Sequence, residues 1–266
     1  KIVEVRSASG PPGTSVEVRH LFFNLPARRK FLRSEETERS HVHHYLLLAA
    51  LAYPEVGFTF VHDQRMVWQL PAIATTQVCA ERLKAVRERL RALYGSDLNL
   101  VPVDASAPVG STPTGAAGTV NVQAEGGSGQ NEPGTPPHLR LWGFIGAPGV
   151  SRATREDQHL FVNRRPIDNR SLHYAMLEGY HTSLMKGRYP VCCLFLEMTP
   201  SLVDVNVHPT KREVKFRDEW AVRRFVTGAV REALLAYHAP SPTSRPSRLP
   251  DNAAPDIGAN APSAEQ

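Results

Sequence analysis

Cysteine is scarce in this chain, and long apolar runs are missing. The 266 residues include three cysteines, Cys79, Cys192 and Cys193, whose odd number and spacing give neither a zinc site nor a disulfide framework. Reduced, buried thiols in a cytoplasmic protein are the simplest interpretation. The longest apolar run, residues 45–53, is far shorter than the roughly 20 residues that span a bilayer, so we expect no membrane partner. No leader opens the chain, which begins with Lys1 inside a strand-like pattern and is expected to be a fragment.

Two segments lack the residues that build a core. Residues 104–138 contain no Lys, Arg or aromatic side chain, and 12 of these 35 residues are Gly or Pro. Such a segment buries too little apolar area to offset its ordering entropy, so we predict a disordered insertion. Six prolines among residues 239–266 predict a flexible linker. Limited proteolysis is expected to cut both segments first.

Acidic residues are absent between Arg19 and Arg33, where five arginines and lysines occur. Residues 151–190 carry seven basic and four acidic side chains, and the whole chain has a net charge of +5 and a pI near 9.3. A basic balance favours polyanionic partners such as nucleic acid or nucleotide. A solvated basic surface that serves only solubility is the alternative interpretation.

The first block, residues 1–75, mixes strands and one helix. Residues 2–5 and 16–18 suggest an antiparallel pair around a tight turn, and residues 58–68 fit a hairpin. Ser34 with two following glutamates predicts a helix N-cap. Helical spacing predicts that one face packs on a sheet, formed by Val42, Tyr45, Leu46, Ala49, Ala50 and Tyr53. His41 and His44 could bind a metal ion, but no third ligand is near in sequence, so we expect a solvated helix face and no metal.

The second block, residues 76–238, predicts helices and strands in alternation. Residues 79–93 trace a helical face that ends at Gly95, and further helices are expected after Asn169 and over residues 222–237. Strands are expected at 139–145, 158–163, 191–198 and 202–207. We therefore predict an α+β fold whose mixed sheet is covered by helices on one side.

The most specific segment is residues 203–216, which read V-D-V-N-V-H-P-T-K-R-E-V-K-F. Alternating valines predict a half-buried strand, Pro209 ends it, and a second short strand is expected after Lys211. A lysine on that turn presents a flexible positive charge for which phosphate is the natural partner. The alternative interpretation is that Lys211 is simply one of five charged residues in a solvated hairpin.

This segment closely resembles the V-D-V-N-V-H-P-x-K-x-E-V-x-F signature of the MutL family of DNA mismatch-repair proteins. Two more segments resemble family motifs in the same order. Residues 13–32 match a run written G-T-x-V-x-V-x-x-L-F-x-N-x-P-A-R-x-K-F-L, and residues 161–167, F-V-N-R-R-P-I, match F-V-N-x-R-x-[IV]. The resemblance spans most of residues 1–238.

The resemblance implies the C-terminal part of a GHKL ATPase α/β sandwich over residues 1–75, then a ribosomal-protein-like transducer domain over 76–238. Gly13 and Thr14 match the last nucleotide-contacting motif, and Lys211 matches the lysine that reaches the terminal phosphate of ATP. The family's catalytic glutamate, its Mg²⁺-binding asparagine and its lid precede that motif. We therefore expect that ATP and Mg²⁺ act in a longer protein and that this fragment alone is inactive.

Arg165 matches the family arginine assigned to DNA contact, and its basic neighbours are expected to line the same phosphate-binding surface: Arg164, Arg170, Lys186 and Arg188. The implied partners are double-stranded or mismatched DNA, a mismatch-recognition protein, a downstream helicase and nuclease, and a second copy of the chain. The implied location is the bacterial cytoplasm, at the nucleoid. A type II topoisomerase-like ATPase subunit and a non-enzymatic nucleic-acid-binding scaffold are the alternatives.

Overall fold

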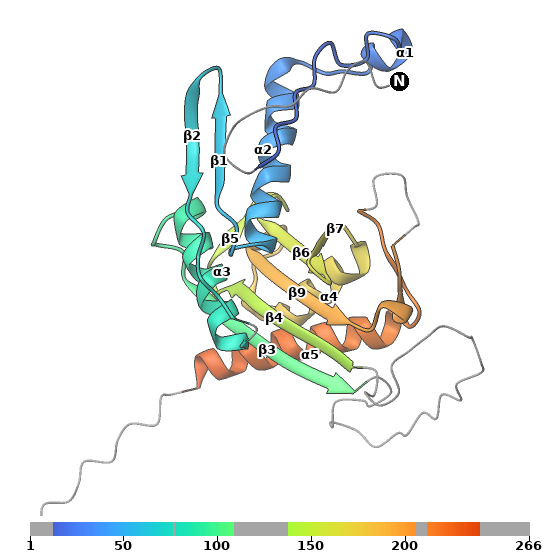
Figure 1. Ribbon diagram of the computed structural model, residues 1–266. Coiled ribbons are helices and arrows are strands. Elements are labelled where there is room, and N and C mark those ends of the chain that lie inside the picture. The colour runs from blue at the N-terminus through green and yellow to red at the C-terminus, as the bar shows by residue number, and fades with distance from the viewer. Residues whose placement is uncertain (1–12, 77, 109–137, 206–211, 240–266) are drawn as a thin grey trace, which may run out of the picture.

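A five-stranded mixed sheet forms the centre of the protein, as the α+β prediction requires (Figure 1). The computed structural model describes residues 13–76, 78–108, 138–205 and 212–239. β6 runs parallel to β9, and the other neighbouring strands are antiparallel. In order across the sheet, the strands are β3 (Leu100–Pro108), β4 (His138–Gly146), β9 (Cys192–Met198), β6 (Gln158–Val162) and β7 (Arg165–Ile167).

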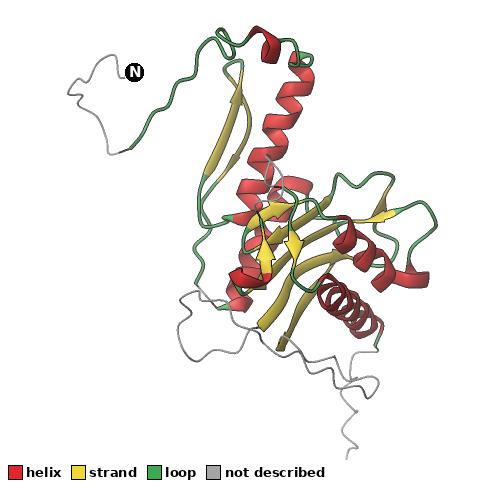
Figure 2. Ribbon diagram, turned by 90° about the vertical axis from the view of Figure 1, so that its right-hand side faces the viewer, coloured by secondary structure: helices red, strands yellow, loops and turns green. Residues whose placement is uncertain are grey.

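Helices cover both faces of this sheet, so the prediction of one covered face is wrong (Figures 1 and 2). α4 (Arg170–Tyr180) and α5 (Glu219–His238) pack on one face. α3 (Cys79–Tyr94) and the end of α2 (Glu35–Ala52) pack on the other. The central strands are apolar on both sides: in β4, Leu141 faces α5 and Trp142 faces α3. Strands with two apolar faces need cover on each of them.

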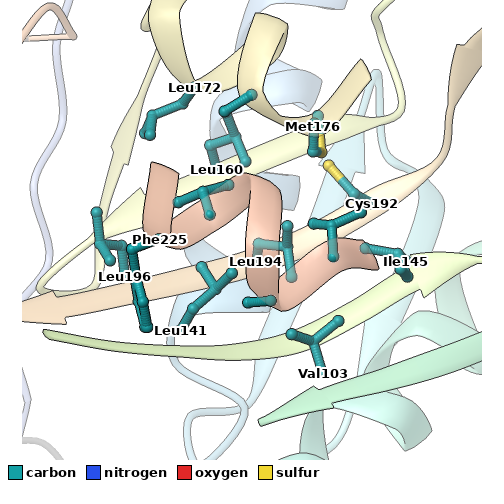
Figure 3. Packing of buried hydrophobic residues seen from close by; sticks show 14 of the residues in the cluster. Val103, Leu141, Ile145, Leu160, Leu172, Met176, Cys192, Leu194, Leu196 and Phe225 are labelled. Atoms are coloured by element: carbon teal, nitrogen blue, oxygen red, sulfur yellow. The ribbon is translucent and has the colours of Figure 1, made fainter. Parts of the chain in front are cut away.

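The core under α4 and α5 depends on close approach of the two helices (Figure 3). Met176 of α4 and Phe225 of α5 meet Leu194 and neighbouring residues of the sheet. Gly179 makes the approach possible, because a Cβ there would lie 2.7 Å from the Val230 side chain. The helix predicted after Asn169 is confirmed as α4, and the Asn169 side chain caps it by accepting a hydrogen bond from the Leu172 N–H.

α2 begins as predicted, but of the predicted face only Ala50 is buried, and most of the buried side chains lie elsewhere on the helix. The Ser34 hydroxyl accepts a hydrogen bond from the Thr37 N–H, which confirms the N-cap. Leu47, Leu48 and Leu51 are buried, whereas Val42 and Tyr45 of the predicted face are each 50% exposed. Apolar residues surround the second half of this helix in sequence, so its periodicity does not select a face. Contact with α3 and the sheet selects it.

Short paired strands complete the described fold. The predicted hairpin at residues 58–68 is confirmed as β1 (Phe58–His62) with β2 (Arg65–Leu70). Within the predicted strand at 202–207, Val203–Asp204 form β10, which pairs with β11 (Lys215–Phe216), and Leu202 ends a 3-10 turn, η2 (Pro200–Leu202). Residues 206 and 207 of that prediction lie outside the described residues. The sequence pattern did not indicate β3 or β7, nor the remaining short elements: α1 (Pro26–Arg29), β5 (Ser151–Arg152), η1 (His181–Ser183) and β8 (Tyr189–Pro190).

Two other expectations need correction. Residues 104–108 and His138 belong to strands β3 and β4, so the predicted insertion begins too early and ends too late. Backbone hydrogen bonds between β3 and β4 order these residues, although their composition alone predicts disorder. Val16 and Val18 are 81% and 74% exposed and form no strand, because no described segment pairs with them. Residues 2–5, 109–137, 206–211 and 240–266 lie outside the described residues.

The three cysteines are free thiols. Cys192 and Cys193 are buried on opposite faces of β9, whereas Cys79 is partly exposed. No helix in the described part of the chain is long and apolar enough to cross a membrane. The domain boundary near residue 75 stays a prediction.

Candidate functional site

The turn between β6 and β7 places the predicted DNA-binding arginines. Asn163 and Arg164 occupy this two-residue turn with φ of 48° and 66°. Two positive φ values are typical of a type I′ hairpin, and asparagine tolerates this conformation well. The Asn163 side chain donates to Met198 O and accepts from Met198 N–H, both at 3.0 Å. These bonds fix the turn to the end of β9.

Arg164 points from this turn to the end of α2. Its Nε donates to Ala52 O at 3.0 Å, its Nη2 forms an ion pair with Glu55, and its guanidinium lies 4.5 Å from the centre of the Tyr53 ring. These contacts join residues from the two predicted blocks. Arg164 is therefore engaged within the protein, unlike the exposed cation expected at a DNA surface.

Arg165 and Arg170 are both exposed. Arg165 pairs with Val162 in the β6–β7 hairpin, and Arg170 is the first residue of α4. The segment between them contacts the chain that follows Lys211, because Asp168 N–H donates to Arg212 O at 2.8 Å. In addition, Asn169 Nδ2 donates to Val214 O at 3.1 Å.

Lys186 and Arg188 lie away from Arg165. Arg188 donates to the Ser151 hydroxyl at 3.1 Å and to Ser151 O at 3.0 Å, beside the β5–β8 pair. This pair adjoins the start of β9, whereas Arg165 adjoins its end. About 13 Å of strand separates Cys192 from Leu196, at about 3.3 Å per residue. The five predicted cations therefore do not form one cluster.

The predicted phosphate contacts are placed only in part. Thr14 has an exposed hydroxyl, and nothing lies within 4 Å of a Cβ built on Gly13, so the backbone there is open to a ligand. Both features fit a contact with a nucleotide. Lys211 lies outside the described residues, so its proximity to Thr14 stays a prediction.

Arg212, which directly follows Lys211 in sequence, is anchored on α2. Its guanidinium lies 5.7 Å from the centre of the Tyr45 ring, within cation–π range. Its Nε is buried and has no hydrogen-bond partner within the described structure. The chain after Lys211 therefore contacts both α2 and the segment between Arg165 and Arg170.

A buried histidine lies near this anchor, and sequence reasoning missed it. His159 of β6 is 2% exposed, and its Nε2 lies 2.5 Å from the Tyr94 hydroxyl. Burial lowers the pKa of His159 to about 3, and the nearby His44 contributes to the shift. Burial also lowers the pKa of His44, with a smaller contribution from the Arg212 charge. His159 is thus a neutral part of the packing between α2, α3 and β6.

Metal-ligand spacing occurs at the start of α2, where sequence analysis did not consider it. Among the described residues, Glu35, His62 and Asp63 place one ligand atom each within 4.8 Å of one another. His41 and His44 do not belong to this group. Glu35 and Asp63 have side chains that are 86% and 78% exposed, as is usual for surface carboxylates.

Comparisons with known proteins show which proteins this chain resembles. A family profile described as "DNA mismatch repair protein, C-terminal domain" matches residues 121–235. DNA mismatch repair protein MutL of Opitutus terrae is 39% identical over 236 residues, covering 88% of this chain and 31% of that protein. The MutL protein of Syntrophotalea carbinolica is 38% identical over 260 residues, covering 95% of this chain and 35% of that protein.

A solved structure described as the N terminal domain of a DNA repair protein shares the fold, with a TM-score of 0.59. It is 19% identical and covers 81% of this chain and 59% of that chain. The relatives at 38–39% identity, over most of this chain, define it as a member of the mismatch-repair class. More specifically, the chain belongs to the MutL family, and it spans about a third of the length of the curated relatives it matches.

Proposed function

We propose that this chain acts in DNA mismatch repair as part of an ATP-gated matchmaker, which links mismatch recognition to a downstream helicase and nuclease. ATP binding would bring two copies together, and Lys211 would contact the terminal phosphate. Arg165 and Arg170 would bind DNA phosphates with little sequence preference. ATP and Mg²⁺ are the expected cofactors of the longer protein, and Thr14 offers a hydroxyl to the nucleotide.

One junction carries this proposal. Asp168 and Asn169, which lie between Arg165 and Arg170, are hydrogen bonded to Arg212 and Val214. The segment that follows the predicted phosphate-sensing lysine is thus bonded to the segment between the predicted DNA-binding arginines. A movement of Lys211 toward a phosphate would be transmitted through these two bonds, as a nucleotide-gated switch requires.

The alternatives lose support. The relatives described above are MutL proteins, which argues against a topoisomerase-like ATPase subunit. A scaffold with only a ribosomal-type domain accounts for the second block alone. It leaves the contacts between α2 and the β6–β7 turn without a role.

The DNA-binding part is tested by Arg165→Glu in the full-length protein. We expect weaker duplex binding for all sequences. The slope of log K against log salt concentration should become less steep, by about 1 for each lost phosphate contact. Lys186→Glu makes the same charge change at the other end of β9 and is expected to leave the slope nearly unchanged. An unchanged slope for Arg165→Glu in a filter-binding titration would contradict the proposed surface.

A further inference from the structure

The carboxyl end of α2 is held by two arginines that come from beyond residue 75. Arg164 from the β6–β7 turn bonds Ala52 O and Glu55. Arg89 from α3 bonds Pro54 O and Val56 O. Five consecutive residues, 52–56, are thus held from two sides. Cations are favoured at this position, since a helix C-terminus has unpaired carbonyls and partial negative charge.

The two arginines differ in their surroundings. Arg89 is 0% exposed, and its Nη2 lies 2.7 to 3.0 Å from three carbonyl oxygens, those of Pro54, Val56 and Pro71. The side chains of Arg164 and Glu55 are each 35% exposed. Breaking the Arg89 contacts leaves a buried charge without partners, whereas water can replace either partner of the Arg164–Glu55 pair. Arg89 is suited to a permanent contact and Arg164 to a reversible one.

A polar cavity of about 100 Å³ adjoins the Arg164–Glu55 pair. It is lined by Glu55, Thr75, Thr76, Arg82, Trp142 and Arg164 among others. Trp142 Nε1 and Glu55 Oε2 are buried and have no hydrogen-bond partner within the described residues. A polar cavity of this size holds a few waters, which can bridge such a donor and acceptor. The contact between α2 and the sheet thus has room for water on the side where Arg164 lies.

We propose that Arg164 is a positioning residue that couples the nucleotide-binding part of the protein to its DNA-binding part. Arg164 and Arg165 are consecutive, and one contacts α2 while the other is exposed. We call the Arg164–Glu55 ion pair the latch. A shift of the end of α2 relative to the sheet would lengthen or break this ion pair and so displace the β6–β7 turn, which Arg165 directly follows. The inference rests on the proposed function, and it gives Arg164 a role other than the DNA contact expected from its position in sequence.

The test measures the dissociation constant for duplex DNA of the full-length protein with and without a non-hydrolysable ATP analogue. The larger of the two dissociation constants is then divided by the smaller to give a ratio. For Arg164→Gln we expect the nucleotide-free affinity to stay within about twofold of the wild type, while the ratio falls toward one. Arg164→Lys keeps the positive charge and an N–H donor beside Glu55 and is expected to recover part of the ratio. Arg165→Gln, the matched control, should weaken both affinities and keep the ratio.

Three outcomes would overturn the latch. Equal weakening of both affinities by Arg164→Gln would make Arg164 a DNA contact. A wild-type ratio in this variant, together with a lower melting temperature, would make the pair merely structural. A ratio of one in the wild-type protein would refute the ATP gating itself and the latch with it, so failure of the proposed function is distinguishable from failure of the latch alone.

Discussion

Arg89→Met removes the buried guanidinium under the end of α2 and keeps a side chain of similar length. The Val56 and Pro71 carbonyls lose the donor that they share, at 3.0 and 2.9 Å. Pro54 O keeps a second donor, because Ile73 N–H lies 2.9 Å from it. Two charge-assisted bonds at about 1.5 kcal/mol each give an expected loss of about 3 kcal/mol in the free energy of unfolding.

Arg89→Lys provides the matched control. An ammonium group has three donors, enough for the three carbonyls, and it lacks the Nε and Nη1 groups that are buried without partners in Arg89. We expect this variant to lose about 1 kcal/mol, since the shorter reach of lysine lengthens the bonds. Urea unfolding measures both losses, and m should stay constant. A Met variant that loses less than about 1 kcal/mol, or a Lys variant as unstable as Met, would refute the reasoning.

Two further predictions concern the core. Below pH 6.5 the unfolded chain protonates His159, whereas the folded chain does so only near its pKa of about 3. Because the unfolded state binds more protons in this window, stability falls with falling pH by about 1.4 kcal/mol per unit from this group. His159→Gln should flatten the urea-measured profile between about pH 6 and 4, and an unchanged profile would count against a buried neutral histidine. Gly179→Val should lower the melting temperature through a clash with Val230, by about 4 to 8 °C for a loss of about 2 kcal/mol. A wild-type melting temperature would show that α4 and α5 are not packed this closely.

Local sequence signals predicted the elements whose residues act locally. Ser34 caps its helix through a bond to the residue three positions on, so a short pattern identifies it. The hydrophobic runs of β4 and β9 predicted strands, although the need for cover on both faces was missed. The face of α2 was mispredicted because residues 45–53 are apolar around the whole helix, and only tertiary contact distinguishes Leu51 from Tyr53.

The site was predictable only where a motif fixes the backbone. The F-V-N-x-R match indicated a strand end, and β6 does end there, at Val162, but the tight turn at Asn163 and Arg164 was not predicted. It did not indicate that Arg164 contacts Glu55, since that partner lies 109 positions away in sequence. Arg89 and His159 were missed for a similar reason. Arg89 is one of several charged residues in α3, and His159 is a single polar residue in a strand, so neither stands out until the structure shows that both are buried.

The central claim is that Lys211 senses the terminal phosphate of ATP, and steady-state ATP turnover of the full-length protein tests it most directly. Arg212 is unsuitable as the surface-charge control, because its guanidinium lies over Tyr45. Lys215 is exposed in β11 and serves instead. We predict that Lys211→Ala lowers turnover by about 10- to 1000-fold, as loss of one transition-state contact typically does, and that Lys215→Ala has little effect. Turnover of the Lys211 variant equal to that of the wild type would contradict the account.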